Sequence, residues 1–475
     1  MMEHDPKLPA YSTGDPNSFA YSTARERWPI ILTQAIDDVY RTVANCDDAA
    51  QRDEGKKIVA ELAQLKYEVQ HDRALTPIRD DGYPDVAIYN KELEQLGPLT
   101  WLRAPWLFTE CYLFRRMSTY FTLSQRWKNY DVFARQKIKT FRSSRPAVLE
   151  LAARYKELIT QMRTNSEHNP EAEKLIFMEM CEVCLWGNAT DLSLLTSLTY
   201  EDIQKLQGSE ARRKAEKNVL VNELPAVYAH LLAAKNDPAK AHRDRRVDIV
   251  LDNAGFELYV DLILAGYLLS AGLATTVVLH PKSIPWFVSD VLPSDFAVLL
   301  NALANPRSFY ETPSEDDLLQ NKQPETLRDK EIEELEFLFS EWSKFHAEGM
   351  LVLRPNRVWT GPGCFWRLPA EAPNVVEDFK ESELVIFKGD LNYRKLVGDV
   401  SWDPTTPFTE ALGPLGPASG INVLALRTCK ADVVVGLQPG KDEELKQMEG
   451  GGGTSGARKW AWNGKWAVMS FSKGS

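Results

Sequence analysis

The sequence is poor in the residues that form disulfide frameworks or histidine metal sites. Its 475 residues include six cysteines and seven histidines, and no two histidines stand four positions apart. So few cysteines in so long a chain do not form a disulfide framework. There is also no run of eighteen apolar residues and no apolar stretch of signal-peptide type in the first thirty residues. We therefore expect no membrane association and a reducing compartment, with the cytoplasm as the default and nuclear presence left open.

The sequence also lacks an excess of positive charge, since its 67 Asp and Glu residues outnumber its 56 Lys and Arg residues. The net charge is -11 and the sequence pI is about 5.4. Long-range attraction therefore does not draw the chain to nucleic acid or to anionic lipid, and we expect no nucleic-acid partner. A small anionic substrate would need local positive charge from a few Lys or Arg side chains or from a bound metal.

Two patterns that resemble functional motifs are incomplete. Cys181 and Cys184 have the spacing of a redox or zinc pair, but no second pair accompanies them, and we interpret them as buried thiols. The glycine run 450–453 lacks the Lys-Ser/Thr of a phosphate-binding loop, so we interpret 439–459 as a mobile linker. The polar, proline-containing stretch 306–328 is also expected to be a loop.

The chain divides into three parts by composition and hydrophobic periodicity. Residues 1–25 are polar and rich in Pro, Ser and Thr, which predicts a flexible arm. Residues 26–245 show apolar positions at helical spacing, which predicts an all-helical subdomain. Residues 246–475 alternate strand and helix patterns, which predicts an α/β core with a largely parallel sheet. We expect these three parts to fold together as one integrated domain. The predicted strands are 247–251, 274–279, 350–353, 384–387, 423–426, 432–435 and 466–471.

Polar residues follow four of these strands directly, and in open α/β sheets ligands bind at the carboxyl ends of parallel strands. Asp252 and Asn253 follow the first strand, and Asp290 lies in the segment after the second. Residues 389–395 and 427–430 follow two later strands. We therefore expect these acids, amides and bases to meet at one edge of the sheet.

Carboxylate and amide oxygens are hard ligands that suit Mg²⁺ or Mn²⁺ better than Zn²⁺. Asp252, Asn253 and Asp290 are thus candidate metal ligands, and Arg394 and Lys430 are candidates to neutralise a phosphate. Asn392 and the first backbone N–H groups of the helix after Gly255 are candidate donors. Taken alone, Asp252 is interpreted equally well as the N-cap of that helix.

Four separated motifs resemble one family in the right order along the chain. They are 252–258 (DNAGFEL), 284–290 (IPWFVSD), 387–396 (FKGDLNYRKL) and 427–430 (RTCK). They resemble the damage-control phosphatases (domain of unknown function 89), and within them the eukaryotic sugar-phosphate phosphatases, also called acidic-residue-methyltransferase-like, with their Arg-Thr-x-Lys motif. The segment 185–193 (LWGNATDLS) is similar to the family too.

The resemblance implies a three-layer α/β/α core with an N-terminal helical subdomain and a divalent metal: Mn²⁺, Co²⁺ or Ni²⁺, or Mg²⁺ in cells. It implies that Asp252, Asn253 and Asp290 are the catalytic metal ligands. The residues that it implies for substrate binding are Asp252, Asn253, Asp390, Leu391, Asn392, Tyr393, Arg394 and Lys430. The implied reaction is hydrolysis of small sugar phosphates such as fructose 1-phosphate and fructose 6-phosphate, by a chain that we take to be a monomer.

Several alternatives stay open. An attacking water could be oriented by Asp252 or by Asp290, and a phospho-aspartate is the competing chemistry, although the DxDx(T/V) arrangement that accompanies it elsewhere is absent. Asn188 and Asp191 could reach the site or could cap a helix. The alternative enzyme is an S-adenosylmethionine-dependent protein-glutamate O-methyltransferase, which usually needs more glycines in the first turn than the single Gly255. A binding protein without catalysis is the third hypothesis.

Overall fold

Seven strands form one sheet in the computed structural model, which describes residues 3–164, 169–187, 217–240, 243–314, 317–318 and 321–475. Their order across the sheet is β1-β7-β6-β5-β2-β3-β4. Every neighbouring pair is parallel except β6 with β7, which is antiparallel. The predicted largely parallel sheet is confirmed. The strands are β1 (Val219–Asn222), β2 (Arg246–Val250), β3 (Thr276–His280), β4 (Leu351–Leu353), β5 (Ser382–Lys388), β6 (Val423–Thr428) and β7 (Ala467–Ser472).

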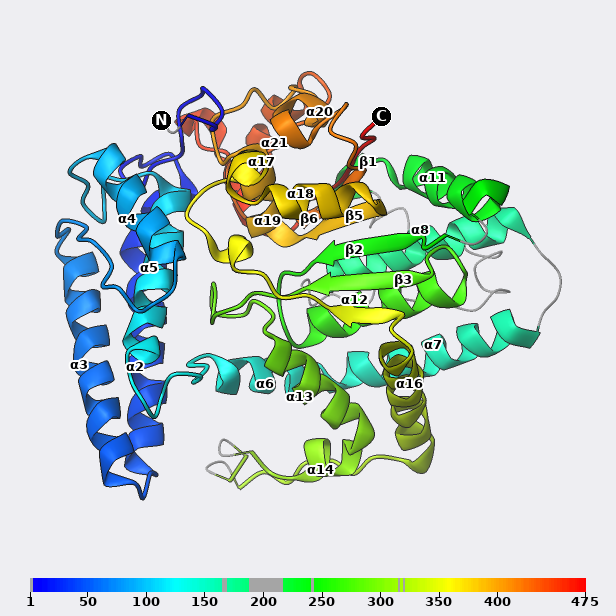
Figure 1. Cartoon of the computed structure of the whole chain (residues 1–475), viewed down its shortest axis with the longest axis horizontal. Helices are drawn as coiled ribbons and strands as arrows, with labels where there is room; N and C mark the ends of the chain where they lie inside the picture. Colours follow the sequence, from blue (N-terminus) through cyan, green and yellow to red (C-terminus); the bar gives the residue numbers. More distant parts are fainter. Residues whose placement is uncertain (1–2, 165–168, 188–216, 241–242, 315–316, 319–320) are drawn as a thin grey trace.

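Helices cover both faces of this sheet, as the predicted three-layer arrangement requires (Figure 1). Alternate residues of β2 show why: Val247 and Ile249 join the apolar core of one face, and Val250 joins that of the other. The first face is covered mainly by α7 (Arg145–Thr164), α8 (Pro170–Trp186), α11 (Leu224–Asn236), α12 (Phe256–Ser270), α13 (Pro293–Ala304) and α16 (Asp329–Ala347). The second face is covered by α17 (Leu368–Glu371), α18 (Pro373–Lys380), α19 (Gly389–Val397), α20 (Phe408–Ala411) and α21 (Lys441–Gln447).

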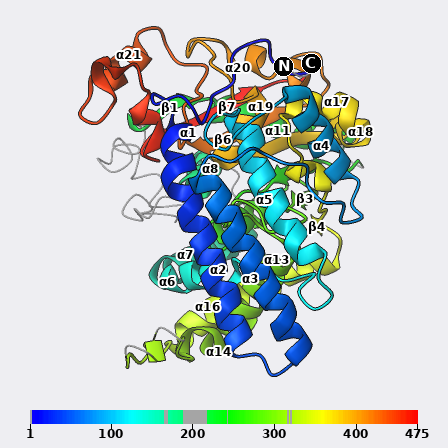
Figure 2. The same ribbon diagram turned by 90° about the vertical axis from the view of Figure 1, so that its left-hand side faces the viewer.

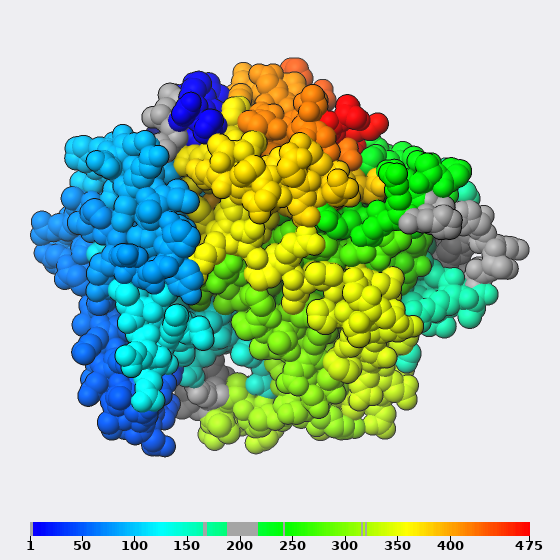
Figure 3. Space-filling view, in the orientation of Figure 1, coloured from blue at the N-terminus to red at the C-terminus, as the bar shows by residue number. Residues whose placement is uncertain are grey.

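A separate helical layer stands beside the sheet. Figures 1 and 2 show α2, α3 and α5 side by side along this flank, and Figure 3 shows the same blue segments against the green and yellow core. The helices are α1 (Phe19–Ser22), α2 (Trp28–Ala44), α3 (Ala49–Gln70), α4 (Asp85–Leu96) and α5 (Trp106–Thr122), and α6 (Ala134–Ser143) connects them to α7. Their apolar core also takes in Trp286, Leu391 and Ala431 from the second half of the chain. Helices of 26–245 therefore contribute both to this layer and, through α7, α8 and α11, to one face of the sheet.

The predicted arm 1–25 makes buried contacts with the second half of the chain. Asp5 accepts hydrogen bonds from the Arg367 guanidinium at 2.6 and 2.7 Å. Ser18 donates to the Asp432 carboxylate at 2.9 Å, and the backbone N–H of Phe19 donates to the same oxygen at 3.0 Å. Polar composition predicted a loose segment, but these polar side chains are bound to buried charges, which a sequence pattern does not reveal.

Four local expectations were wrong. The segment 432–435 is not a strand: its valines are buried, but its polar backbone groups bond to side chains, since Arg427 donates to the Val433 carbonyl and the Val435 N–H donates to the Tyr393 hydroxyl. The strand β1 was not predicted. The expected loops contain two helices, α14 (Pro306–Glu311) in 306–328 and α21 in 439–459.

In the described part of the chain, no helix is both long and apolar enough to cross a membrane.

The core around α12 leaves no room for a side chain at Gly266. A Cβ atom there would lie 2.2 Å from the Tyr155 hydroxyl oxygen and 2.9 Å from Trp342 Nε1. We predict that Gly266→Ala lowers the free energy of unfolding by about 1–3 kcal/mol through overpacking, even though alanine favours an isolated helix by about 1 kcal/mol. Urea denaturation measures this, and an alanine variant as stable as the parent protein would contradict the packing described.

Candidate functional site

Two chain segments meet at the carboxyl end of β2 and carry the three predicted metal ligands. Asn253 and Asp290 form an isolated antiparallel bridge. Two backbone hydrogen bonds make this bridge: Ala254 N–H donates to the Ser289 carbonyl at 2.7 Å, and Val291 N–H donates to the Asp252 carbonyl at 2.9 Å. The structure therefore brings Asp252, Asn253 and Asp290 together, as the strand-end argument predicted.

The segment that delivers Asp290 has an unusual backbone. Phe287 and Val288 have φ angles of 43° and 70°, in the left-handed region that a β-branched residue such as valine rarely adopts. The Phe287 ring stacks on Phe114 of α5, with centroids 4.8 Å apart. Such strain persists where the surroundings enforce it, and it is concentrated at functional sites. The helical layer thus helps to hold the Asp290 segment in place.

The side chains at this junction share hydrogen bonds. Asn253 Nδ2 donates to Asp252 Oδ2 at 2.8 Å and to Glu257 Oε2 at 2.7 Å. The Ser289 hydroxyl donates to Asn253 Oδ1. The amide of Asn253 therefore lies between two carboxylates on its nitrogen side and a hydroxyl on its oxygen side.

Negative charge exceeds positive charge in this buried cluster. Lys282 Nζ lies 3.2 Å from Asp290 Oδ2. Lys388 Nζ lies 3.3 Å from Glu257 and 2.7 Å from Asp261. With Asp252 as the fourth, the cluster thus holds four carboxylates and two ammonium groups that contact three of them, and all six side chains are buried.

This environment disfavours ionisation of the two acids that are candidate ligands. Burial, with the charges of Glu257 and Asp290, raises the pKa of Asp252 well above its usual value. Burial raises the pKa of Asp290 to about 6, although Lys282 opposes the shift. A cation placed between these oxygens would remove the unfavourable charge excess.

The residues fit a divalent cation with oxygen ligands. Among the described residues, no group of three or more His, Cys, Asp or Glu side chains is placed to hold a metal ion. Instead, the candidate set combines two carboxylates with an amide, which are donors suited to Mg²⁺ or Mn²⁺. Within the described chain, Asn392 Oδ1 at the end of β2 is buried without a hydrogen-bond partner, and such atoms often mark a bound ion or water.

Residues 389–395 make up most of α19, and their side chains contact different parts of the protein. Asp390 Oδ1 accepts from Arg427 Nε at 2.8 Å and from the Lys430 backbone N–H at 2.9 Å, so it holds the Lys430 segment against the helix. Asn392 donates to the carbonyls of Val250 and Leu251 at the end of β2. Leu391 lies in the apolar core of the helical layer.

The structure places Tyr393 and Arg394 among partners of their own. The Tyr393 ring is fully buried, and its hydroxyl accepts from the Val435 N–H. The Arg394 guanidinium donates to Glu110 at 2.8 Å and to Asp399 at 2.9 Å, and it stacks on Trp106. Its charge is therefore already balanced by carboxylates. Lys430 is half-buried, and it is the ammonium that acts on Asp252 together with Lys282.

Five residues of the site were missed in reasoning from the sequence. Glu257, Lys282, Ser289, Lys388 and Gly389 touch the three predicted ligands or one another. Each lies inside or within two residues of a motif segment, which is the signal that could have found them. Asn188 and Asp191 lie outside the described residues.

Two helices begin at this edge of the sheet without a side-chain cap. The N-cap residue of α12 is Gly255, and that of α19 is Lys388; neither caps its helix through its side chain. The first N–H groups of a helix favour an anion, and the helix dipole adds to this preference. The edge thus offers donors for a phosphate next to the acid cluster.

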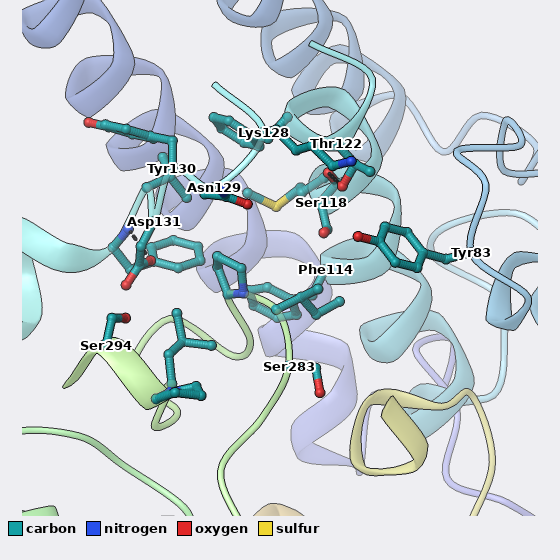
Figure 4. Close-up of a pocket in the computed structure, with 18 of the residues that line it drawn as sticks. Tyr83, Phe114, Ser118, Thr122, Lys128, Asn129, Tyr130, Asp131, Ser283 and Ser294 are labelled. Atoms are coloured by element: carbon teal, nitrogen blue, oxygen red, sulfur yellow. Dashed lines mark hydrogen bonds between the residues drawn. The ribbon is translucent and has the colours of Figure 1, made fainter. Parts of the chain in front are cut away.

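A cavity of about 280 Å³ is lined by α5 and by residues 283–285 and 292–294, which flank the segment of Asp290 in the sequence (Figure 4). Phe114, Ile284 and Pro285 supply apolar walls, and Ser118 and Tyr83 turn their hydroxyl groups toward it. None of the predicted site residues lines it. It is a neighbour of the candidate site and a distinct space.

The fold, the motif positions and the acid cluster agree with one class of protein. The family model "Damage-control phosphatase ARMT1-like domain" matches residues 23–445. The chain belongs to this family of phosphatases, so the resemblance seen in the sequence motifs is confirmed. Members of the family are generally metal-dependent.

Individual relatives align over nearly their whole length. The chain is similar to damage-control phosphatase ARMT1 of Danio rerio, at 33% identity over 485 residues and 99% of each chain. It is 34% identical to that of Xenopus laevis, covering 96% of each chain, and 32% identical to that of Homo sapiens, covering 98% of each. A crystal structure of a DUF89 family protein from Pyrococcus horikoshii aligns at 13% identity and a TM-score of 0.35, covering 93% of this chain and 97% of that chain, which is too weak a likeness to carry any argument.

Gly389 allows α19 to approach the acid cluster. Its φ is 80°, and a Cβ atom there would lie 1.9 Å from Asp252 Oδ2. We predict that Gly389→Ala displaces the Asp252 carboxylate and lowers phosphatase activity by at least about tenfold, since small misplacements of reacting groups cost rates of this size or more.

Gly349→Ala is the matched control. Gly349 also has a positive φ, 74°, but a Cβ atom there would meet nothing within 4 Å. Both variants carry the backbone cost of about 1 kcal/mol, so urea denaturation should find Gly349→Ala mildly destabilised with full activity. Equal loss of activity in the two variants would show that the contact with Asp252 is unimportant.

Proposed function

We propose that this chain is a metal-dependent phosphatase that hydrolyses small sugar phosphates such as fructose 1-phosphate and fructose 6-phosphate. In this proposal, Asp252, Asn253 and Asp290 hold the metal. The observation that carries it is the buried excess of carboxylates over ammonium groups where the two segments meet, since a divalent cation would balance it. The names of the relatives support the reaction class.

The proposed cation is Mn²⁺, Co²⁺ or Ni²⁺, with Mg²⁺ as the alternative in cells. When bound, such an ion polarises the phosphoryl group and makes a water molecule more acidic. Asp252 or Asp290 then orients the attacking water, and the present contacts favour neither. Cytoplasmic location and a monomeric state remain predictions from the sequence.

Phosphate binding is assigned to groups around the metal ligands. The uncapped N-termini of α12 and α19 offer backbone N–H groups to the phosphate oxygens. Lys430 supplies the cation that meets the charge spread over these oxygens in the transition state. Asp390 positions Lys430 through its backbone. Arg394, bound by Glu110 and Asp399, shapes the site by holding α19 to the helical layer.

The proposed function predicts that phosphatase activity depends on a bound metal. Metal-stripped protein is expected to release no phosphate from fructose 1-phosphate, and added Mn²⁺ is expected to restore release. Asp252→Ala should lower kcat by at least about a hundredfold at saturating metal, because it removes a ligand and leaves the remaining cluster unable to orient water. Phosphate release measures both effects. If folded, Mn²⁺-loaded protein hydrolyses none of the sugar phosphates tested, the proposed function is wrong.

A second prediction separates substrate binding from the metal. Lys430→Gln should raise KM for fructose 1-phosphate about tenfold without weakening Mn²⁺ binding, since one charged contact to phosphate contributes about 1–3 kcal/mol. Lys465→Gln, which changes an exposed lysine, is the control and should leave KM unchanged. Equal KM values in the two variants would remove Lys430 from the phosphate site.

A further inference from the structure

We propose that Glu257, anchored by Lys388, is a positioning residue that fixes the orientation of the Asn253 amide and thereby sets the affinity of the site for its metal. This inference rests on the proposed metal role of Asn253. Glu257 lies one helical turn after Asn253, in the first turn of α12, and its side chain is 5% exposed. It is thus a buried acid whose position follows from the helix itself.

The two ends of the Asn253 amide meet different partners. Nδ2 donates to Glu257 Oε2 at 2.7 Å and to Asp252 Oδ2 at 2.8 Å. Oδ1 accepts from the Ser289 hydroxyl at 2.5 Å. A flipped amide would place its oxygen against two carboxylates, which offer no proton when ionised. The two acids therefore select one orientation, and the amide oxygen keeps a second lone pair for a metal.

Glu257 is itself held from behind. Lys388 Nζ donates to Glu257 Oε1 at 3.3 Å, to Asp261 Oδ1 at 2.7 Å and to the Cys184 carbonyl at 3.1 Å. All three Lys388 contacts come from helices α8 and α12, so the ammonium is fixed by the packed core. Ligand orientation at metal sites commonly depends on outer hydrogen bonds of this kind, and their loss typically costs about 10–100-fold in metal affinity or activity.

Glu257→Gln changes this arrangement without changing its size. The new amide oxygen can still accept from Lys388, but the new NH₂ group then faces Asn253 and can donate to the Asn253 oxygen. Of the two acids that select the amide orientation only Asp252 then remains, so the flipped Asn253 amide becomes more populated. In the flipped amide an NH₂ group replaces the oxygen on the side that should face the metal. We expect the Mn²⁺ dissociation constant to rise about tenfold or more.

The double variant Asn253→Asp/Glu257→Gln supplies a rescue that a merely structural role would not give. A carboxylate has oxygen at both ends, so it can accept from the amide introduced by Glu257→Gln and still offer an oxygen to the metal. We therefore expect the double variant to bind Mn²⁺ more tightly than Glu257→Gln alone. In the parent background Asn253→Asp should weaken binding, because the new carboxylate would face Asp252 and Glu257.

The experiment is a titration of the full chain with Mn²⁺, following free Mn²⁺ by electron paramagnetic resonance without substrate. Glu92→Gln is the matched control, since Glu92 is also buried and bound to a cation, Arg367, outside the site. Glu92→Gln should lose about as much stability as Glu257→Gln, but its Mn²⁺ dissociation constant should equal that of the parent protein.

The outcomes separate the inference from the proposed function. No Mn²⁺ binding by the parent protein would overturn both. Binding by the parent protein with an unchanged constant in Glu257→Gln, or additive losses in the double variant, would overturn the positioning role alone. Complete loss of binding in Glu257→Gln without rescue would make Glu257 a ligand and also overturn it. If Glu257→Gln does not fold, Ser289→Ala tests the other end of the amide: a constant raised about threefold or more supports the inference, and an unchanged constant overturns it.

Discussion

Burying several carboxylates together is costly unless positive charge accompanies them, and the site depends on this constraint. Asp252, Glu257, Asp261 and Asp290 lie in the core at and behind the carboxyl ends of β2 and β3. Lys282 balances part of this charge from one side, and Lys388 balances part from the other. The arrangement is consistent with a cation between Asp252, Asn253 and Asp290. Two backbone features help to place these residues: the strained Phe287–Val288 pair precedes Asp290, and Gly389 allows α19 to approach Asp252.

The helical layer is part of this arrangement. Phe114 of α5 stacks on Phe287 and supports the segment that ends in Asp290. The first turns of α5 also contact α19, where Glu110 binds Arg394 and Trp106 lies against the same guanidinium. The N-terminal helices therefore hold two of the loops that follow strands, and this explains why family similarity extends over residues 23–445 and includes both halves of the chain.

The sequence predicted the parallel sheet and the meeting of Asp252, Asn253 and Asp290, because strand periodicity and strand ends are local signals. The segment 432–435 failed because its buried valines have a strand-like composition but bond through their backbone to Arg427 and Tyr393. Lys282 and Lys388 were missed because a buried lysine is recognisable only from its partners. The carboxylate partner of Arg394 could not be predicted for the same reason, since Glu110 is 284 positions away.

The central claim is that one divalent cation lies between Asp252, Asn253 and Asp290. The most direct measurement is a crystal structure of the Mn²⁺-loaded protein with anomalous scattering recorded to locate the metal. The account predicts an anomalous peak within coordination distance of oxygen atoms of these three residues. A protein that releases phosphate only with Mn²⁺, yet shows its anomalous peak elsewhere, would contradict the account and move the active site away from the end of β2.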